Sequence, residues 1–189
     1  MYRFNYLLPT LLALVITLRC SAQQCTNITL RTIYGTTITT NFVRHYNATV
    51  FVLLAPECPI CINYTPTLNK LSTQLKANNI QLVGVFCGTL YTTHNYQQFA
   101  QRYGINFPLL HDANKQLQRA LAGTHTPHCF IVNRKGEIIY NGLLDNKNAT
   151  LGAHRTTATI NYVLDNCTDY INATKLHHAN TTPVGCLIE

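Results

Sequence analysis

Residues 49–61 read Thr-Val-Phe-Val-Leu-Leu-Ala-Pro-Glu-Cys-Pro-Ile-Cys, an apolar run followed almost at once by two cysteines. The run at residues 49–55 predicts a buried strand. The next segment, residues 59–77, carries apolar side chains at helical spacing. They share one face of the predicted helix: Cys61, Tyr64, Leu68, Leu71 and Leu75. The sequence therefore predicts a strand that passes into a helix at the cysteine pair.

The motif Cys58-Pro59-Ile60-Cys61 lies at the start of this helix. Unpaired backbone N–H groups and the positive end of the helix dipole there favour a thiolate over a thiol. We expect Cys58 to be exposed and to exchange disulfides, and Cys61, one turn later, to be more buried and to resolve the mixed disulfide. Because so tight a loop adds little stability by chain entropy, a reversible redox pair is favoured over a structural bridge.

Strands and helices alternate along the rest of the chain. Strands are predicted at residues 28–33, 36–43, 80–87 and 107–110, with a hairpin at residues 128–132 and 137–140 around the turn at 133–136. Helices are predicted at residues 93–103, 113–121 and 153–173. This alternation predicts an α/β fold in which a largely parallel sheet is closed by one antiparallel hairpin.

The N-terminus has the composition of a secretory signal peptide at residues 1–22. Arg3 precedes an apolar stretch at residues 7–18, and the small residues before position 23 allow cleavage after Ala22. The apolar stretch is short for a membrane span. An uncleaved anchor and a lipid-modified Cys20 are the alternatives.

The 189-residue chain is long enough for one domain, expected at residues 23–174, with a tail at residues 175–189 along the domain surface. The formal net charge is +7, and removal of Arg3 and Arg19 with the signal leaves about +5. The remaining Lys and Arg residues are scattered, so no nucleic-acid partner is expected. No cofactor and no metal are expected, and a membrane contact is expected only through an uncleaved signal or a lipid anchor.

Seven cysteines remain after the predicted cut, in a compartment where disulfides persist. They are Cys25, Cys58, Cys61, Cys87, Cys129, Cys167 and Cys186. The odd number leaves at least one free or paired with another molecule. Cys186 is a relay candidate if the tail folds back over Cys58. Pairing of Cys186 with Cys167 or Cys25, or a free thiol, is the favoured interpretation.

With these elements placed, the chain resembles the thioredoxin superfamily, and within it the redoxin group shared by peroxiredoxins and thioredoxin-like reductases. Cys58-Pro59-Ile60-Cys61 is similar to the superfamily's active-site motif, and Pro66 to the proline that kinks its helix. Thr126-Pro127, just before a strand, resembles the cis-proline loop that faces the disulfide. The resemblance covers residues 49–145, and the tail at residues 183–188 is similar to a peroxiredoxin-like subgroup of exported bacterial redoxins.

This resemblance implies a thioredoxin-like fold with a central mixed sheet flanked by helices. A cis-proline presents backbone to a substrate chain and leaves no N–H to bury. The residues implied for the site are Cys58 and Cys61 for catalysis, Thr126 and Pro127 for substrate binding, and Glu57, His125 and Cys186 as auxiliaries.

The sequence departs from the superfamily at three positions near the cysteines. Glu57 replaces the usual tryptophan, and a carboxylate beside a thiolate opposes its ionisation. Val52 stands where thioredoxins have a buried acid, and Tyr64 where cytochrome-maturation relatives have one, so neither proton-transfer acid is in place. His125 and His128 flank the cis-proline, where they could aid proton transfer or make local hydrogen bonds.

The leading hypothesis is an extracytoplasmic thiol–disulfide oxidoreductase, located in a bacterial periplasm or secreted. Its partners would be protein thiols and disulfides of exported proteins, together with an unidentified recycling partner. One alternative is a zinc half-site completed by His125, His128 or Cys129. Another is a non-catalytic module that holds a peptide in the cis-proline groove.

A peroxiredoxin-like thiol peroxidase is a further alternative. Such an enzyme carries Thr or Ser three residues before its reactive cysteine and Pro seven before. Relative to Cys58 these positions hold Ala55 and Phe51, and relative to Cys61 they hold Cys58 and Leu54. The site is therefore not built for fast peroxide reduction, although slow oxidation to a sulfenic acid is open to any thiolate.

Overall fold

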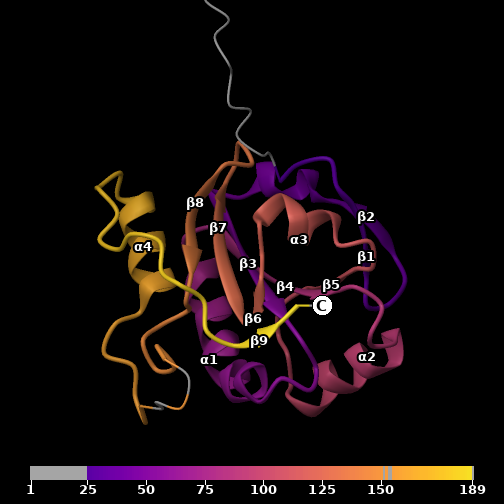
Figure 1. Cartoon of the computed structure of the whole chain (residues 1–189). Coiled ribbons are helices and arrows are strands. Elements are labelled where there is room, and N and C mark those ends of the chain that lie inside the picture. Colours follow the sequence, from indigo (N-terminus) through magenta and orange to yellow (C-terminus); the bar gives the residue numbers. More distant parts are fainter. Residues whose placement is uncertain (1–24, 151, 153–154, 189) are drawn as a thin grey trace, which may run out of the picture.

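The computed structural model describes residues 25–150, 152 and 155–188, and Figure 1 shows a central sheet flanked by helices. The strands are β1 (Thr29–Thr32), β2 (Thr37–Thr39), β3 (Ala48–Leu54), β4 (Ile80–Cys87), β5 (Leu109–Asp112), β6 (His125–Thr126), β7 (His128–Asn133), β8 (Ile138–Gly142) and β9 (Cys186–Leu187). The helices are α1 (Pro59–Lys76), α2 (Thr93–Arg102), α3 (Gln116–Leu121), α4 (Tyr162–Ile171) and the 3₁₀ helix η1 (Thr40–His45). The predicted signal peptide at residues 1–22 lies outside the described residues.

Strand β3 lies in the interior of a seven-stranded sheet ordered β2-β1-β5-β4-β3-β7-β8. It pairs parallel with β4 and antiparallel with β7, which sets Phe51 beside Val83 on one side and Phe130 on the other. All seven residues of β3 are buried, because both its edges are paired and both its faces are covered. Alternate side chains enter two separate cores, Val52 in one and Phe51 in the other.

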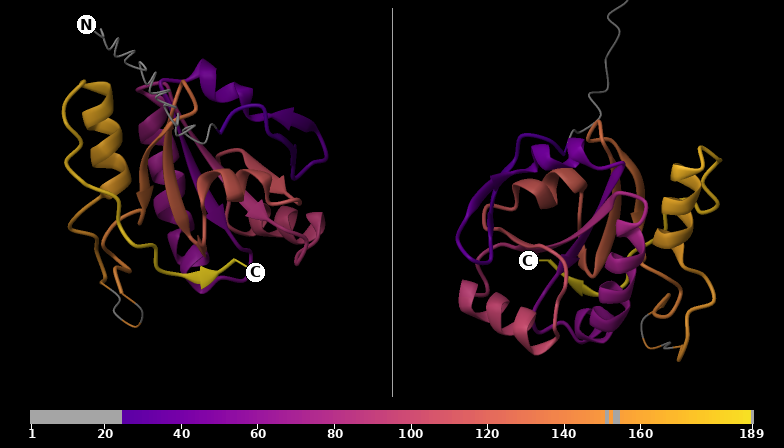
Figure 2. Two further views of the ribbon diagram at one scale, coloured as in Figure 1. Left: turned by 45° about the horizontal axis from the view of Figure 1, so that its top comes forward. Right: turned by 180° about the vertical axis from the view of Figure 1, so that it is seen from behind.

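Helices cover the two faces of the sheet unequally. Helices α1, α2 and α4 supply one core, with side chains such as Leu68, Phe99 and Val163. The 3₁₀ helix η1 and helix α3 supply the other core through Val43 and Leu117. The two further views in Figure 2 show α1 and α4 on one side of the sheet and α3 on the other. A central mixed sheet flanked by helices is therefore confirmed.

Helix α1 confirms the predicted apolar face. Its buried residues are Cys61, Tyr64, Thr65, Leu68, Leu71, Ser72 and Leu75. Pro66 lies inside the helix and has no N–H, so the carbonyl of Ile62 lacks its usual helical donor. The hydroxyl of Thr65 donates to that carbonyl instead, at 2.9 Å, and the helix continues to Lys76.

The sheet is less parallel than the sequence predicts. Parallel pairing is confined to β3 with β4 and β4 with β5, whereas the pairs β1–β2, β1–β5, β3–β7 and β7–β8 are antiparallel. The strand predicted at residues 36–43 ends at Thr39 and continues as η1, because Val43 turns inward to a fully buried position.

Two predicted elements begin later than expected. The strand predicted at residues 107–110 is β5, which starts at Leu109, and the helix predicted at 113–121 is α3, which starts at Gln116. The carboxylate of Asp112 accepts hydrogen bonds at 2.8 Å from the N–H groups of both Gln116 and Gln118. This side chain supplies the acceptor for the first turn and so sets where α3 begins.

The helix predicted at residues 153–173 is wrong in its first half. Helix α4 begins at Tyr162, and residues 155–161 before it are not helical. The buried side chain of Asn146 accepts hydrogen bonds from the N–H groups of Thr159 and Ile160, at 2.9 and 3.1 Å. These backbone groups are held in a loop by Asn146, and the apolar residues at helical spacing lie almost entirely in the second half of the predicted segment, where α4 forms.

His128 is buried at the start of β7 and packs against Phe130, with ring centroids 4.2 Å apart. Its Nδ1 accepts a long hydrogen bond of 3.4 Å from the N–H of Thr124. Its Nε2 has no partner within the described residues. Burial lowers the pKa of His128 to about 4, so the imidazole is neutral at pH 7.

We therefore expect acid to destabilise the fold through His128. The unfolded chain takes up this proton near the ordinary pKa of about 6.5, and the folded chain only near 4. Between these values the unfolded state binds more protons, so the free energy of unfolding falls as the pH is lowered. The loss should reach about 2 kcal/mol once partial solvent screening is allowed for. Urea denaturation at neutral pH and at the lower end of this window measures it, and a His128→Phe variant should lose less. Equal losses in both proteins would contradict this assignment.

Candidate active site

The cysteine pair lies where β3 gives way to α1. The N–H of Cys58 donates to the carbonyl of Ala55 at 3.2 Å, which closes the turn between the two elements. Cys58 is the N-cap residue of α1, and Pro59 occupies the first turn, where a missing N–H removes no helical hydrogen bond. Cys61, one turn later, is 0% exposed, as predicted. The prediction of an exposed Cys58 is wrong, because Cys58 is only 3% exposed beneath the thiol of Cys186.

Cys58 and Cys61 are both free thiols, and their surroundings shift their pKa values in opposite directions. Hydrogen bonds from Cys61, and then from Cys186, hold the pKa of Cys58 well below its ordinary value, although burial opposes this. Complete burial, together with the hydrogen bond and charge of Cys58, raises the pKa of Cys61 well above its ordinary value. At neutral pH the pair offers a thiolate at Cys58 and a thiol at Cys61.

The Thr126–Pro127 peptide bond is cis, as predicted, and faces Cys58. The Sγ of Cys58 lies 3.1 Å from the carbonyl oxygen of Thr126, a contact in which a thiol donates and which therefore works against the thiolate. Thr126 belongs to β6, whose edge pairs antiparallel with β9 and sets Thr126 opposite Cys186. The start of α1, the cis-proline loop and the tail strand thus meet at one sulfur atom.

Cys186 reaches this point because the tail folds back over the domain. Figure 1 shows the tail passing from α4 across the lower part of the molecule to β9, beside β6. The Sγ of Cys186 lies 2.9 Å from the Sγ of Cys58. Of the favoured alternatives the structure shows the free thiol, and pairing of Cys186 with Cys167 or Cys25 is wrong, because those two thiols are buried in the two different cores of the domain.

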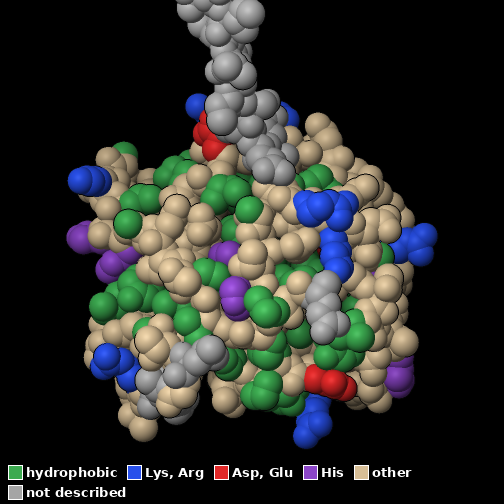
Figure 3. All heavy atoms as spheres, viewed as in Figure 1, with side chains coloured by type: hydrophobic (Ala, Val, Ile, Leu, Met, Phe, Trp, Pro, Cys, Tyr) green, Lys and Arg blue, Asp and Glu red, His purple; other side chains and the backbone are tan. Residues whose placement is uncertain are grey.

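A groove of about 610 Å³ opens beside Cys58. Its walls include Phe86 and Tyr91, and Leu187 of β9, which is 74% exposed. Cys87 lines the same groove, but burial raises its pKa to about 12, so it is a thiol at neutral pH. Figure 3 shows hydrophobic side chains gathered on the face that the tail crosses, with Lys and Arg scattered around it.

Glu57, at the position of the superfamily's tryptophan, is exposed and accepts a hydrogen bond of 3.4 Å from the hydroxyl of Tyr91. Sequence reasoning missed Tyr91. A signal was available, since Tyr91 follows β4, a strand parallel to β3, and the carboxyl ends of parallel strands meet at one edge of a sheet. An aromatic residue in that loop therefore lies near the cysteine pair.

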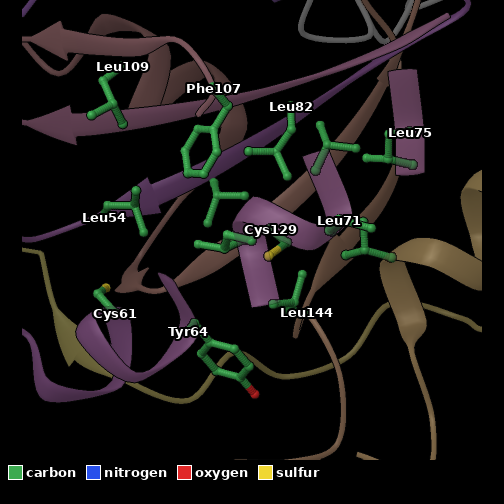
Figure 4. Close-up of a cluster of buried hydrophobic side chains, with 14 of the residues drawn as sticks. Leu54, Cys61, Tyr64, Leu71, Leu75, Leu82, Phe107, Leu109, Cys129 and Leu144 are labelled. Atoms are coloured by element: carbon green, nitrogen blue, oxygen red, sulfur yellow. The ribbon is translucent and has the colours of Figure 1, made fainter. Parts of the chain in front are cut away.

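Tyr64 donates a hydrogen bond to the buried carboxylate of Asp145 at 2.5 Å. Asp145 also accepts from the N–H of Lys147 at 2.8 Å. Figure 4 shows the Tyr64 hydroxyl pointing away from Cys61. Tyr64 and Asp145 therefore tie α1 to the segment after β8 and do not replace the proton-transfer acids that are absent beside the thiols. The chain contains only seven Asp and Glu residues, and Asp145 directly follows the apolar pair Leu143-Leu144. A rare acid next to apolar residues was the sequence signal for a buried carboxylate with a hydrogen-bond partner.

The histidines beside the cis-proline make local contacts. The Nδ1 of His125 lies 2.8 Å from the hydroxyl oxygen of Thr124. His128 and Cys129 are consecutive in β7 and enter opposite faces of the sheet, with Cys129 in the core under α1. No three or more His, Cys, Asp or Glu residues are grouped as metal ligands in the part of the chain that the structure describes.

A mixed sheet, a C-x-x-C motif at the start of α1 and a facing cis-proline define a thioredoxin-like redoxin. Residues 22–141 match the AhpC/TSA family, and the chain belongs to that family. The thiol-disulfide oxidoreductase ResA of Halalkalibacterium halodurans is 28% identical over 82 residues, which is 43% of this chain and 46% of that protein. The matching segment thus spans less than half of that relative.

Solved structures show the same fold at low identity. A hypothetical protein from Sinorhizobium meliloti matches with a TM-score of 0.76 and 18% identity, covering 87% of this chain and 91% of that one. An uncharacterized conserved protein from Geobacillus kaustophilus matches with a TM-score of 0.77 and 20% identity, and the match covers 88% of this chain and 89% of that one. A secreted Mycobacterium tuberculosis disulfide oxidoreductase, homologous to E. coli DsbE, matches with a TM-score of 0.55 and 18% identity. This match covers 78% of this chain and 96% of that one.

Proposed function

We propose that the protein is an extracytoplasmic thiol–disulfide oxidoreductase that acts on exported proteins through Cys58 and Cys61. The observation that carries the proposal is the contrast within the pair, a stabilised thiolate at Cys58 above a fully buried thiol at Cys61. A purely structural disulfide needs no such contrast. Membership of the AhpC/TSA family and the similarity to ResA support the same chemistry.

In the reducing direction, the Cys58 thiolate attacks one sulfur of a substrate disulfide and expels the other as a thiolate, which takes up a proton. Cys58 in the mixed disulfide carries no charge, so the charge that helps to raise the pKa of Cys61 is gone. Cys61 then loses its proton and attacks the sulfur of Cys58, and the substrate leaves with two thiols. A dithiol partner would reduce the Cys58–Cys61 disulfide, and the oxidising direction is the same series reversed.

The substrate is proposed to be an extended protein segment that carries a cysteine. The groove beside Cys58 is lined in part by apolar side chains such as Phe86 and Leu187, which suit apolar side chains of a substrate, and the edge of β6 at Thr126 offers backbone hydrogen bonds. Export would follow from the predicted signal at residues 1–22. No helix among the described residues is long and apolar enough to cross a membrane.

The experiment compares a peptide disulfide with hydrogen peroxide as oxidants of the reduced protein. Thiol loss followed by stopped flow should be at least about a hundredfold faster with the peptide disulfide, because Cys58 is ionised but Ala55 and Phe51 supply no peroxide-binding hydroxyl or proline. A variant with both Cys61→Ser and Cys186→Ser, which keeps Cys58 but neither thiol that hydrogen-bonds to it, should stop at the mixed disulfide. Faster oxidation by peroxide would establish a peroxidase instead, and inertness to both oxidants would favour a peptide-binding module.

A further inference from the structure

The C-terminal tail is anchored on the domain before it reaches Cys58. The hydroxyl of Thr181 accepts a hydrogen bond from the N–H of Leu143 at 2.8 Å. The tail passes so close to Gly142 that a Cβ added there would overlap the Thr181 hydroxyl. The tail backbone therefore lies directly against the end of β8.

A second close approach occurs at Gly185, beside the cis-proline loop. A Cβ added at Gly185 would overlap the carbonyl oxygen of Thr126 and lie 3.2 Å from the nitrogen of Pro127. A glycine therefore permits the backbone contact that β9 makes with β6. The next residue is Cys186, so this contact is what brings its Sγ to 2.9 Å from that of Cys58.

We propose that Cys186 is a third redox cysteine, and that β9 is a tethered strand that delivers it to Cys58. Strand β9 occupies the edge of β6 that the proposed function assigns to a substrate segment, so the inference rests on that function. A protein substrate displaces β9 to reach Cys58. The return of β9 then places Cys186 against the mixed disulfide.

At that stage Cys186 loses its proton more readily than Cys61. Partial burial, together with the hydrogen bond and charge of Cys58, raises the pKa of Cys186 to about 11. When Cys58 enters a mixed disulfide its charge disappears, and burial alone then continues to raise the pKa of Cys186, which is an exposed residue. Cys61 is 0% exposed and keeps its full desolvation cost. Its exposure and its 2.9 Å contact with Cys58 therefore favour Cys186 over Cys61 as the attacking thiol.

The exchange balances without an added oxidant. The Cys58 thiolate forms a bond to one sulfur of the substrate disulfide, and the first substrate thiolate leaves and is protonated. Cys186 gives its proton to solvent and attacks Cys58, the bond to the substrate breaks, and the second thiolate leaves and is protonated. The substrate has gained two electrons and two protons, and the protein holds a Cys58–Cys186 disulfide. Cys61 can then displace Cys186 from Cys58 with no net electron transfer, and a dithiol reductant restores the thiols.

The test uses a reduced Cys61→Ser variant and one equivalent of oxidised glutathione. Non-reducing tryptic mapping separates the two cysteines, because Lys70 and Lys175 lie between them in the chain. A Cys58–Cys186 cross-linked peptide should be the main product, with the Cys58–glutathione disulfide only transient. Adding Gly185→Ala leaves all the remaining thiols in place but disturbs the contact between β9 and β6. It should slow cross-linking at least about tenfold and let the glutathione adduct accumulate.

Two controls bound this result. Adding Gly104→Ala to the Cys61→Ser variant should leave the cross-linking rate unchanged, because a Cβ at that glycine meets no atom within 4 Å and the strain at its positive φ falls in the turn after α2, outside the tail. Adding Cys186→Ser should leave a stable glutathione adduct on Cys58. A stable adduct in the Cys61→Ser variant itself, with Cys186 still a thiol, would overturn the inference and leave the proposed function intact. If Cys58 takes up no glutathione and forms no cross-link, the proposed function falls and the inference with it.

Discussion

Cys58→Ser is expected to abolish disulfide exchange, with the rate falling at least about a thousandfold. The hydroxyl of serine is not ionised at neutral pH and cannot form a disulfide. The hydrogen bonds from Cys61 and Cys186 act on Cys58 alone, so no other thiol in the groove is similarly activated. Cys87, which lines the same groove, has a pKa raised to about 12. The measurement is the stopped-flow rate of thiol loss against a peptide disulfide.

The matched control for this variant is Cys25→Ser. Cys25 is fully buried on the opposite face of the sheet, and its Sγ lies 4.0 Å from the carbonyl oxygen of Ala120. The same change of sulfur to oxygen there should leave the exchange rate within about twofold, because neither thiol of the pair is touched. Substantial exchange by Cys58→Ser would show that another cysteine is the nucleophile.

Phe51→Ala is expected to lower the free energy of unfolding by about 3–5 kcal/mol. The Phe51 side chain is fully buried in the middle of β3, where it packs against Phe42 with ring centroids 6.2 Å apart. The strand is paired on both sides, so the surrounding backbone cannot collapse into the space that the ring leaves. Urea denaturation measures the change as a lower midpoint with an unchanged slope.

Leu90→Ala provides the comparison for Phe51→Ala. Leu90 is 71% exposed and follows the end of β4, so its truncation removes little buried apolar area. The expected change in the free energy of unfolding is within about 0.5 kcal/mol. A loss for Phe51→Ala no larger than that for Leu90→Ala would mean that β3 does not carry the core as described.

The sequence predicts well those elements whose determinants are local. Strand β4 has the predicted bounds at both ends, because its apolar run lies between Asn78-Asn79 and Gly88. The predicted start of α1 is confirmed, because Pro59 suits the first turn and the apolar face repeats at helical spacing. The predicted hairpin of β7 and β8 is confirmed for the same reason, since a turn at residues 133–136 separates two short apolar runs.

Predictions failed where a side chain outside the predicted element supplies hydrogen bonds to its backbone. Residues 155–161 are polar apart from Ala158 and Ile160, and Asn146 accepts hydrogen bonds from the backbone N–H groups of Thr159 and Ile160 and keeps them in a loop. Asp112 likewise sets the start of α3 at Gln116. Propensity and periodicity describe what a segment prefers alone, and these contacts override that preference.

The sequence by itself determined that a cysteine pair begins a helix after a buried strand and that a proline loop follows at Thr126. Only the tertiary structure decided that Cys58 is buried, that the Tyr64 hydroxyl donates a hydrogen bond to Asp145 and that the thiol of Cys186 contacts that of Cys58. Cys58 and Cys186 are 128 residues apart in the chain. No periodic pattern records a contact across such a distance, because it depends on backbone passing close to backbone at the cis-proline loop, where Gly185 leaves room for it.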